Sequence, residues 1–415
     1  MGHALSQQVL AFMETGEPLY RFFTGSKWAA RQGTEGISDF VAGNPQELPP
    51  PGFVEALQRW SVPRSTDWFA YRDSVPGAKE AVARSLRERL GIAFEVDDVF
   101  LTNGAFSGIS VALKSVVDPG DEVLFLSPPW FFYELIIRSL GVEPVRVRVS
   151  PPAFDPDIDS IAEAITPRTR AILVNSPNNP TGRIYPPEFL RKLADLLSEA
   201  SERNGRPIYL VSDESYSRIL FDGNAFDSPA AFYPRSFLVY TYGKILLTPG
   251  QRLGYVALPP SMPDRELMRG AVFLMQLAMG YAFPNLLLQR ALADLEELSI
   301  DLGHLQAKRD RMVEALRAMG YELHVPEGTF YLLPMAPNGD DLAFTDMLAD
   351  HDVFVLPGTH VELPGYFRIS LTANDEMIDR ALPGFQAAID AARAMRQAAS
   401  PRPTGTLSSN SAPPS

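Results

Sequence analysis

One lysine of the sequence, Lys244, has neighbours that suit chemistry on a bound ligand. It directly follows the apolar run SFLVYTYG at 236–243, and Thr241 and Arg252 place a hydroxyl and a guanidinium nearby in the chain. A primary amine can form a Schiff base with a carbonyl compound and can also carry a proton. Arginine and a hydroxyl suit an anion such as a phosphate. This stretch therefore predicts covalent chemistry on a phosphorylated carbonyl compound.

Other polar and aromatic residues also follow apolar runs. Gly104, Ala105 and Phe106 come after DVFLT and begin a helical segment, where free backbone amides favour a phosphate. Trp130 comes after EVLFLS and offers a flat face to an aromatic ring. Ligands of open parallel α/β sheets bind at the carboxyl edge, so we expect these groups to face one crevice.

One carboxylate and one phenol suggest two further groups of the ligand. Asp213 follows PIYLVS and could bind a protonated ring nitrogen, and Tyr216 could bond a phenolic oxygen. A ring with a phosphate, a basic nitrogen, an oxygen and an aldehyde is pyridoxal 5′-phosphate. A Schiff-base lysine with an aspartate on the ring nitrogen is how proteins hold and tune that cofactor. The residues thus predict pyridoxal 5′-phosphate as the cofactor.

Each of these residues also has an ordinary structural interpretation. A lone lysine such as Lys244 is usually a solvated surface charge, and Asp213 could be a helix N-cap. Trp130 could belong to the core, and Asn179 could simply shape the turn Asn-Pro-Thr-Gly. The functional interpretation is favoured because independent segments place these groups at one predicted edge.

The elements that must position these residues alternate along the chain. Helix-length segments such as 77–91 and 186–205 lie between short apolar runs, which predicts a mainly parallel sheet with helices on both faces. The predicted strands are 98–102, 122–127, 144–149, 170–176, 207–215, 236–243 and 252–258.

A second, smaller α/β set follows the large one. Residues 291–320 predict a long amphipathic helix, and short runs at 321–325, 328–334, 353–358 and 366–372 lead to a helix at 376–396. We therefore expect an N-terminal arm with part of the small domain at 1–45, a large cofactor-binding domain at 46–287, a small domain that includes the linking helix at 288–397, and a disordered tail at 398–415.

Composition narrows the class of protein. The chain of 415 residues is 46% hydrophobic and 21% charged, which is typical of a soluble globular protein with two domains. Its net charge of −13 argues against nucleic acid or an anionic membrane as the main partner. There is no cysteine, and five scattered histidines argue against a structural metal site. With no membrane-length apolar run and no secretory segment, a cytoplasmic location is expected.

The order of these residues resembles the class I/II aminotransferases, a family of fold type I pyridoxal-phosphate-dependent enzymes, from about residue 38 to residue 395. The resemblance implies an α/β fold with a mainly parallel seven-stranded sheet and a smaller α/β domain. The matching motifs are GNP at 43–45, Y-x5-G at 71–77, NGA at 103–105, PPW at 128–130, NNPTG at 178–182, DESY at 213–216, T-x-x-K-x5-G-x-R-x-G at 241–254 and R-I-S at 368–370.

The resemblance also implies a reaction and its catalytic residues. The enzyme would move the amino group of an L-amino acid to a 2-oxo acid through an aldimine with Lys244, which also shuttles the proton at the substrate α-carbon. Asp213 would bind the ring nitrogen and Tyr216 the ring oxygen. The cofactor-binding set would be Gly104, Ala105, Phe106, Trp130, Asn179, Asp213, Tyr216, Thr241, Lys244, Arg252 and Tyr71.

Substrate binding and assembly are implied in the same way. Arg368 would bind the substrate α-carboxylate, with Asn179 and the backbone of Gly43 assisting, although Arg368 could also form a structural salt bridge. Tyr71 is expected to reach the phosphate of a neighbouring subunit, which implies a homodimer with shared active sites.

The chain departs from the family pattern beside the lysine. Many relatives carry serine where this chain has Gly243, and Thr241 replaces a usual serine. We expect cofactor binding to survive with one hydrogen bond fewer.

Reaction and substrate are less well determined by the sequence. Elimination, decarboxylation or oxidation of an amino acid on the same scaffold is the alternative, and a non-catalytic regulator is disfavoured by the acidic charge and the short N-terminal region. The apolar and aromatic segments 18–30 and 271–285 favour neutral or aromatic amino acids over aspartate. Three cations could reverse that preference, namely Arg21, Lys27 and Arg31.

Overall fold

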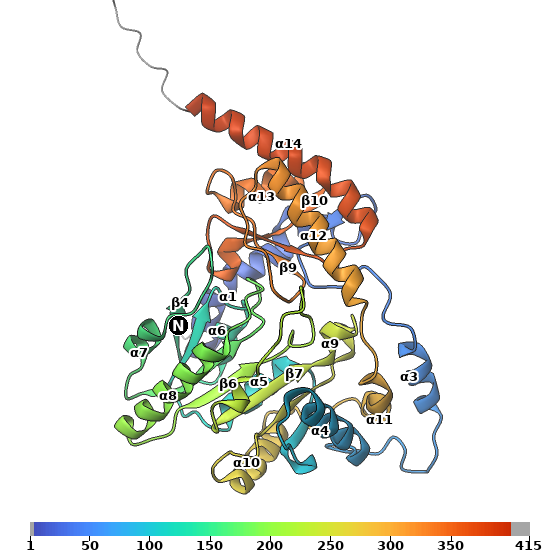
Figure 1. Cartoon of the computed structure of the whole chain (residues 1–415), viewed down its shortest axis with the longest axis vertical. Coiled ribbons are helices and arrows are strands. Elements are labelled where there is room, and N and C mark those ends of the chain that lie inside the picture. Colours follow the sequence, from blue (N-terminus) through green and yellow to red (C-terminus); the bar gives the residue numbers. More distant parts are fainter. Residues whose placement is uncertain (1–3, 400–415) are drawn as a thin grey trace, which may run out of the picture.

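The computed structural model describes residues 4–399, with side chains described for residues 4–397. Its upper part in Figure 1 contains the helices α12, α13 and α14, and its lower part contains the large sheet. The last helix, α14 (Asp375–Ala399), includes residues 398 and 399 of the predicted tail. The rest of that predicted tail lies outside the described residues.

The seven predicted strands form one sheet. Strands β7, β6, β5, β3 and β4 are parallel to one another, whereas β8 is antiparallel to both β7 and β2. The prediction of a mainly parallel sheet is therefore confirmed. In spatial order the strands are β2 (Val99–Thr102), β8 (Gly254–Ala257), β7 (Ser236–Thr241), β6 (Tyr209–Asp213), β5 (Thr169–Asn175), β3 (Glu122–Ser127) and β4 (Glu143–Arg148).

Helices cover both faces of this sheet because its strands are buried on both sides. Val123 and Phe125 of β3 belong to one core cluster and Leu124 and Leu126 to another, as the alternation of side chains along a strand requires. The helices of this part are α3 (Phe53–Ser61), α4 (Pro76–Leu90), α5 (Ala105–Lys114), α6 (Tyr133–Ser139), α7 (Ile158–Ala164), α8 (Pro187–Asn204), α9 (Tyr242–Ile245), α10 (Arg265–Ala278) and α11 (Leu286–Leu295).

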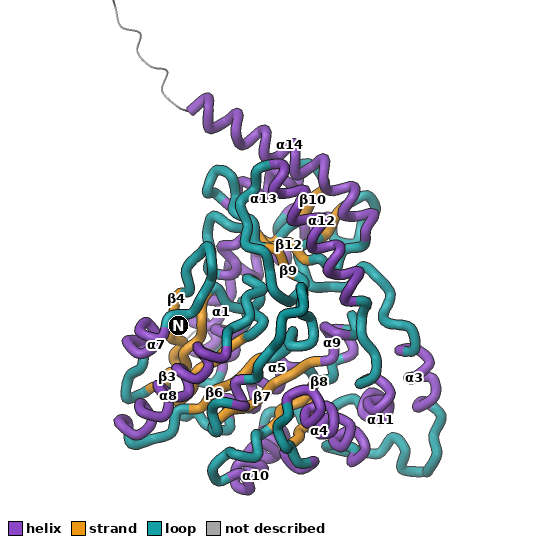
Figure 2. The backbone as a smooth tube through the Cα atoms, in the orientation of Figure 1, coloured by secondary structure: helices purple, strands orange, loops and turns teal. Residues whose placement is uncertain are grey.

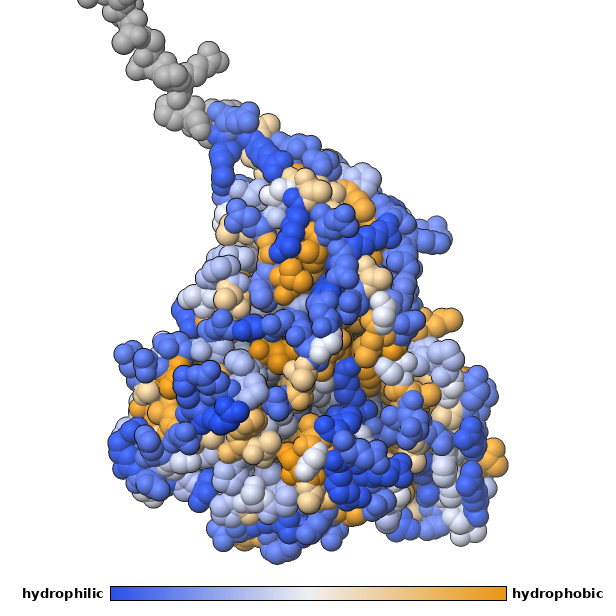
Figure 3. Space-filling model, viewed as in Figure 1, coloured by the Kyte–Doolittle hydropathy of each residue, from blue (hydrophilic) through white to orange (hydrophobic). Residues whose placement is uncertain are grey.

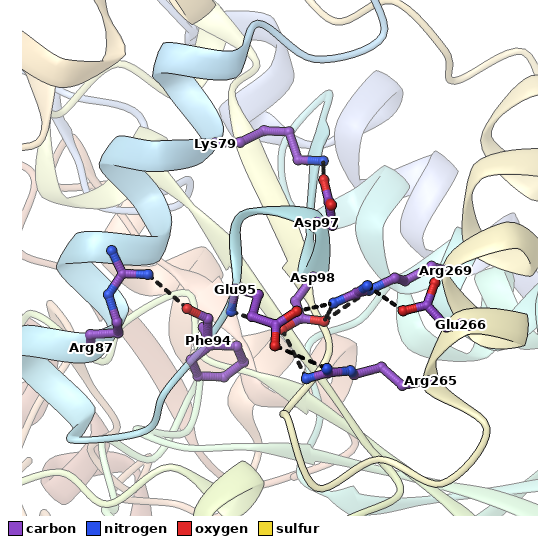
Figure 4. Close-up of polar contacts among 9 residues, drawn as sticks. All are labelled: Lys79, Arg87, Phe94, Glu95, Asp97, Asp98, Arg265, Glu266 and Arg269. Carbon is purple, nitrogen blue, oxygen red and sulfur yellow. Dashed lines mark hydrogen bonds and ion pairs between the residues drawn. The ribbon is translucent and has the colours of Figure 1, made fainter.

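Helix α10 is fixed to the strand β2 side of the sheet by a charged network (Figure 4). Arg269 reaches the buried Asp98 with Nη2–Oδ1 at 2.7 Å and Glu95 with Nη2–Oε2 at 2.8 Å. Arg265 binds Glu95 as well, at 3.1 Å. Because Asp98 is fully buried, both arginines hold the first half of α10 in place.

The upper part of the described structure has two short sheets. In one, β1 (Ser38–Asp39) lies parallel to β10 (Val353–Phe354), so the N-terminal region contributes a strand to this part. In the other, β12 (Phe367–Ser370) lies between β11 (Leu356–Pro357) and β9 (Tyr331–Leu332), antiparallel to both. The accompanying helices are α1 (Gln7–Gly25), α2 (Lys27–Arg31), α12 (Leu302–Met319), α13 (Asp341–Ala349) and α14.

Short 3-10 helices join several of these elements. They are η1 (Val96–Asp98), η2 (Pro229–Ala231), η3 (Pro249–Gln251) and η4 (Gly358–Val361).

The predicted long helix at 291–320 is wrong in one respect: it is two helices. Helix α11 ends at Leu295 and packs against α3 and α4, and α12 begins at Leu302. Asp301 caps α12 by accepting a hydrogen bond from His304 N at 2.9 Å. The intervening segment turns the Glu296 side chain inward, where it binds Arg218 at 2.7 Å. The predicted strand at 321–325 is also absent, since only an isolated bridge joins Leu323 to Pro334.

The surface is mostly hydrophilic on the face shown in Figure 3, with hydrophobic residues gathered in the furrow between the upper and lower parts. Within residues 4–399, no helix combines the length and apolarity needed to cross a membrane.

Candidate active site

A cavity of about 300 Å³ lies at the carboxyl edge of β5, β6 and β7. Figure 2 shows loops filling the region between the large sheet and the small one, where this edge lies. Most of the predicted site residues line the cavity: Ala105, Phe106, Trp130, Asn179, Asp213, Tyr216, Thr241, Lys244 and Arg252. Its other lining residues are Asn175, Ser215, Gly243, Pro249 and Tyr331.

Lys244 projects from the short helix α9, which begins directly after β7. The Thr241 hydroxyl caps this helix by accepting a hydrogen bond from Gly243 N at 3.4 Å, and it donates to Leu253 O at 3.2 Å. The Lys244 amine lies 5.6 Å from the ring centroids of both Tyr216 and Phe330. It forms no ion pair with any acidic side chain of residues 4–397. The amine is therefore available to a ligand in the cavity.

Asp213 is a buried carboxylate held by its own chain. Its Oδ2 accepts a hydrogen bond from Tyr133 Oη at 2.6 Å, and its Oδ1 accepts one from Ser215 Oγ at 2.5 Å. Burial raises the pKa of Asp213, and the hydrogen bonds from Ser215 and Tyr133 oppose that rise. No lysine or arginine of the described residues forms an ion pair with it. The arrangement leaves a fixed, desolvated acid that could bind a protonated nitrogen.

An anion site is formed where β2 leads into α5. Gly104 has a φ of +81° and precedes the free amides of the first turn of α5. A Cβ atom on Gly104 would lie 2.8 Å from Arg252 Nη2, so only glycine lets this guanidinium lie against the turn. Arg252 donates to two backbone carbonyls, Asn103 O and Pro249 O, and has no acidic partner in the described chain. Burial lowers the pKa of Arg252.

Gly243, the departure from the family pattern, has a steric explanation here. A Cβ atom on Gly243 would lie 2.8 Å from Pro249 Cα. The serine that many relatives carry at this position would therefore displace the turn at 248–250.

Arg368 lies beside the cavity and is buried to 2% exposure. Its Nη1 donates to Asn179 Oδ1 at 3.0 Å and its Nη2 to Val41 O at 2.9 Å, while Nε is buried without a partner. No carboxylate of residues 4–397 pairs with it. A buried, unpaired guanidinium is unfavourable, so this residue is suited to bind an anion that enters from outside.

Tyr331 is a site residue that the sequence reasoning missed. Its hydroxyl accepts a hydrogen bond from Tyr216 Oη at 3.2 Å, and its ring lies 4.2 Å from the Arg368 guanidinium carbon. Burial raises the pKa of Tyr331, but the charges of Arg368 and Lys244 outweigh it and lower the pKa overall. A Cβ atom on Gly43 would lie 2.5 Å from Tyr331 Oη, which explains a glycine there. The pairing of β9 with β12, which no local motif reveals, places Tyr331 opposite Ser370.

Tyr71 is a predicted site residue that does not line the cavity in the described chain. Its ring is 87% exposed and lies 5.3 Å from the ring of Phe283. Neither segment 18–30 nor segment 271–285 contributes a lining residue to the cavity.

One cluster elsewhere has side chains that could bind a metal. The ligand atoms of Glu47, His304 and Asp375 lie within 4.8 Å of one another. Lys308 Nζ already binds Glu47 Oε2 at 2.8 Å, so a cation there would face a buried ammonium group. We assign the cluster to holding residue 47 against α12 and α14.

The donor groups at the cavity fit pyridoxal 5′-phosphate. Three cations without acidic partners, Lys244, Arg252 and Arg368, face or border a cavity whose one aspartate is buried and unpaired. A phosphorylated cofactor and a carboxylate substrate would supply the missing negative charges. The orphaned Arg368 Nε and the glycine-permitted contact at Gly104 are the features that fit them best.

Comparison with known proteins points the same way. The profile of the family described as aminotransferase class I and II matches residues 36–385. An aspartate/prephenate aminotransferase of Thermus thermophilus is 32% identical over 367 residues, which cover 86% of this chain and 91% of the relative.

Solved structures agree with the sequence comparison. An amino transferase of Eubacterium rectale has a TM-score of 0.85 at 28% identity, and the match covers 94% of this chain and 99% of that one. The aspartate aminotransferase of Thermus thermophilus solved with maleate has a TM-score of 0.75 at 28% identity, covering 93% and 100%. Because sequence and architecture agree over nearly the whole folded chain, this chain belongs to the class I and II aminotransferases, pyridoxal-phosphate-dependent enzymes that pass the amino group of an amino acid to a 2-oxo acid.

Proposed function

We propose that the cavity at the carboxyl edge of β5, β6 and β7 is where this aminotransferase carries out its reaction, with Lys244 as the covalent attachment point for the cofactor. Bound there, pyridoxal 5′-phosphate supplies an electron sink for the negative charge that forms at the substrate α-carbon. Side chains of this protein would bind the cofactor, bind the substrate and transfer the proton. The observation that carries the proposal is that three cations without acidic partners line or border one cavity that also contains the buried Asp213.

The cofactor-binding roles follow from the geometry of the lining. Arg252, the Thr241 hydroxyl and the amides of residues 104–106 would hold the phosphate. Asp213 would hold the ring nitrogen, since Tyr133 and Ser215 fix its carboxylate. Asn179 and Tyr216 would contact the ring oxygen, and Trp130 would lie on the ring face.

Substrate would bind through its α-carboxylate. Arg368 offers an unsatisfied Nε, and its guanidinium is oriented by Asn179 and by the Val41 carbonyl. Gly43 would assist through its backbone. Its lack of a side chain also leaves room for the Tyr331 hydroxyl.

Lys244 would then move the proton. Its amine would take the proton from the substrate α-carbon and hold it for the later return step, which requires the uncharged amine at the start. The Tyr216 and Tyr331 hydroxyls, joined at 3.2 Å, border the path of that amine.

Amino-group transfer is the direct test. The purified enzyme, supplied with the cofactor, a panel of amino acids and 2-oxoglutarate or pyruvate as the acceptor, should produce the amino acid that corresponds to the acceptor. Lys244→Ala should lower kcat by at least about 10³-fold, in line with loss of a general base and a covalent anchor. Lys192→Ala is the matched control, because Lys192 is 60% exposed and pairs only with Glu188.

Product analysis separates the alternative reactions. Release of ammonia or carbon dioxide without a 2-oxo acid acceptor would replace transamination by elimination or decarboxylation on the same scaffold. An enzyme that binds the cofactor yet transfers no amino group across the panel would contradict the proposal.

We infer, further, that the enzyme works as a homodimer. Apolar side chains are exposed on the outer side of α10 and beyond it, and they form what we call the α10 patch: Phe273, Leu274, Leu277, Phe283 and Tyr71. The Arg265 and Arg269 network fixes α10, the helix that carries three of the five patch residues (Figure 4). Exposed apolar patches of this kind mark contacts with other chains. Tyr71 within it would reach the phosphate of the neighbouring subunit.

Light scattering tests the dimer. The expected mass is twice the 45.8 kDa of one chain, and Leu274→Asp should shift it toward the monomer. Tyr71→Phe should weaken cofactor binding by about two- to tenfold, the value of one hydrogen bond. A monomer that binds cofactor with full affinity would contradict both inferences.

A further inference from the structure

The space beside Arg368 has an aromatic boundary. The Phe131 ring lies 5.8 Å from the Arg368 guanidinium carbon, and the Phe23 ring of α1 lies 6.1 Å from the Phe131 ring. The ring centroids of Trp28 and Phe23 lie 5.5 Å apart. We call Phe131, Phe23 and Trp28 the aromatic wall. It joins the predicted cofactor stack, since Phe131 also lies 6.4 Å from Trp130.

The N-terminal cations that could recognise an acidic side chain are bound elsewhere. Arg21 is 76% exposed and donates to Glu17 Oε1 at 2.9 Å. Lys27 binds Asp350 at 2.8 Å, and Arg31 binds Asp352 at 2.9 Å. Each of these cations is paired with an acid on the protein surface, and none of the three lines the main cavity.

The cavity itself offers no spare cation in the described chain. Its lining includes Lys244 and Arg252, and Arg368 borders it. The proposed function already uses all three, for covalent attachment, for the phosphate and for the α-carboxylate. A second carboxylate on the substrate would be buried without a partner, which is unfavourable.

Asp213 is the only acid of the described residues that lines the main cavity, and the proposed function assigns it to the ring nitrogen. Two further acids, Glu134 and Glu362, line a smaller cavity of about 210 Å³ on the α1 side of Phe131. Arg146 binds both of them, with Nε at 2.8 Å from Glu362 Oε1. A positively charged side chain would therefore find no free counter-charge.

We propose that the enzyme selects amino acids with an uncharged aromatic side chain, and that Phe131 and Phe23 of the aromatic wall determine this preference. Aromatic rings favour contact with other rings at such centroid distances, whereas either charge would be desolvated without a partner. The preference differs from that in the names of the aspartate aminotransferases to which the chain is similar. The inference rests on the proposed function, in particular on Arg368 as the α-carboxylate site.

Calorimetry with unreactive carboxylates tests the preference without turnover. The cofactor-loaded enzyme is titrated with 3-phenylpropanoate and with succinate. The two ligands share one carboxylate, and the other end is a phenyl ring in the first and a second carboxylate in the second. We expect 3-phenylpropanoate to bind at least about tenfold more tightly. Tighter binding of succinate would overturn the inference, because it would show that the assembled enzyme supplies a second cation.

Arg368→Met separates failure of this inference from failure of the proposed function. If Arg368 holds the α-carboxylate, both ligands lose affinity in this variant. A wild-type preference for succinate that depends on Arg368 would reject the aromatic preference alone. Binding of both ligands that is unaffected by Arg368→Met would reject the proposed function itself.

A matched pair of variants on α1 tests the wall. Phe23 contacts Phe131, whereas Tyr20 of the same helix is 69% exposed. Phe23→Ala should lower the affinity ratio of 3-phenylpropanoate to succinate by about threefold or more, and Tyr20→Ala should leave that ratio unchanged. Phe23→Leu keeps the apolar packing and should still lower the ratio. An unchanged ratio in both Phe23 variants would remove the wall from the account.

Discussion

Two arginines in different parts of the molecule are buried to the same 2% exposure but have opposite surroundings. Arg309, on α12, binds Asp222 with Nη2–Oδ1 at 2.7 Å and Asp310 with Nε–Oδ1 at 2.8 Å. Arg368, on β12, binds one amide oxygen and one backbone carbonyl, and its Nε has no partner.

The difference separates groups that hold the fold from groups that await a ligand. Around Arg309 the chain supplies the counter-charge itself, so the desolvation cost of burying this cation is offset by ion pairs within the folded protein. Around Arg368 the chain supplies only neutral oxygens, and the missing negative charge has to come from outside. Arg252 also has only backbone carbonyls as hydrogen-bond acceptors in the described chain, but it is exposed, so water as well as a ligand can solvate its charge.

Glu296→Ala gives the largest expected effect, because it would create another unpaired buried arginine. The Arg218 and Glu296 side chains are 11% and 4% exposed and lie 2.7 Å apart. Removing the acid should lower the free energy of unfolding by about 3–5 kcal/mol. Urea denaturation of this variant and of Glu297→Ala, an exposed neighbour, measures the effect. Equal stability of the two variants would show that burial of Arg218 needs no counter-charge.

Glu214→Gln extends the comparison to buried acids. Burial raises the pKa of Glu214 from 4.5 to about 7, so the folded protein keeps it protonated where the unfolded chain ionises it. The stability from this group is therefore present below pH 4.5 and is lost as the pH rises through about 7. The difference between a pKa of 4.5 in the unfolded chain and about 7 in the folded protein corresponds to about 3 kcal/mol of stability.

Unfolding at two pH values checks this sign. Between pH 5 and pH 8.5 the wild-type protein should lose up to about 3 kcal/mol more stability than Glu214→Gln, whose amide cannot ionise. A variant with the same pH dependence as the wild type would place the pKa of Glu214 near its ordinary value.

The arginine pair itself gives the smallest expected effect and the closest comparison. Arg309→Met should cost about 1–3 kcal/mol, because Asp222 and Asp310 are half exposed and become solvated. Arg368→Met in the ligand-free protein should change stability by less than about 1 kcal/mol, because the unpaired charge is removed along with its hydrogen bonds. Thermal unfolding of both variants measures the difference. A larger loss for Arg368→Met would make Arg368 a structural residue.

Local sequence patterns predicted the sheet and most of the cavity for a physical reason. Parallel strands buried on both faces are continuous apolar runs, and the ligand groups lie at or just after the ends of those runs, as Asp213 ends β6 and Lys244 follows β7. Their positions could therefore be read without knowing which strands are neighbours.

Residues that depend on distant pairings could not be predicted in this way. Tyr331 reaches the cavity because β9 pairs with β12, and Phe23 reaches Phe131 because α1 folds back toward the site. The break before α12 was missed because Glu296 fits an amphipathic helix as a solvated charge, whereas it is bound by Arg218. The roles of Tyr71 and of the other site residues stay predictions.

The central claim is that the unpaired cations at the carboxyl edge hold a cofactor joined to Lys244. Borohydride reduction of the cofactor-loaded enzyme, followed by peptide mass spectrometry, tests it most directly. The account predicts a pyridoxyl group on Lys244, and much less of it in Arg252→Gln, where the phosphate loses its guanidinium. A folded wild-type enzyme that carries the group on other lysines, or carries none, would contradict it.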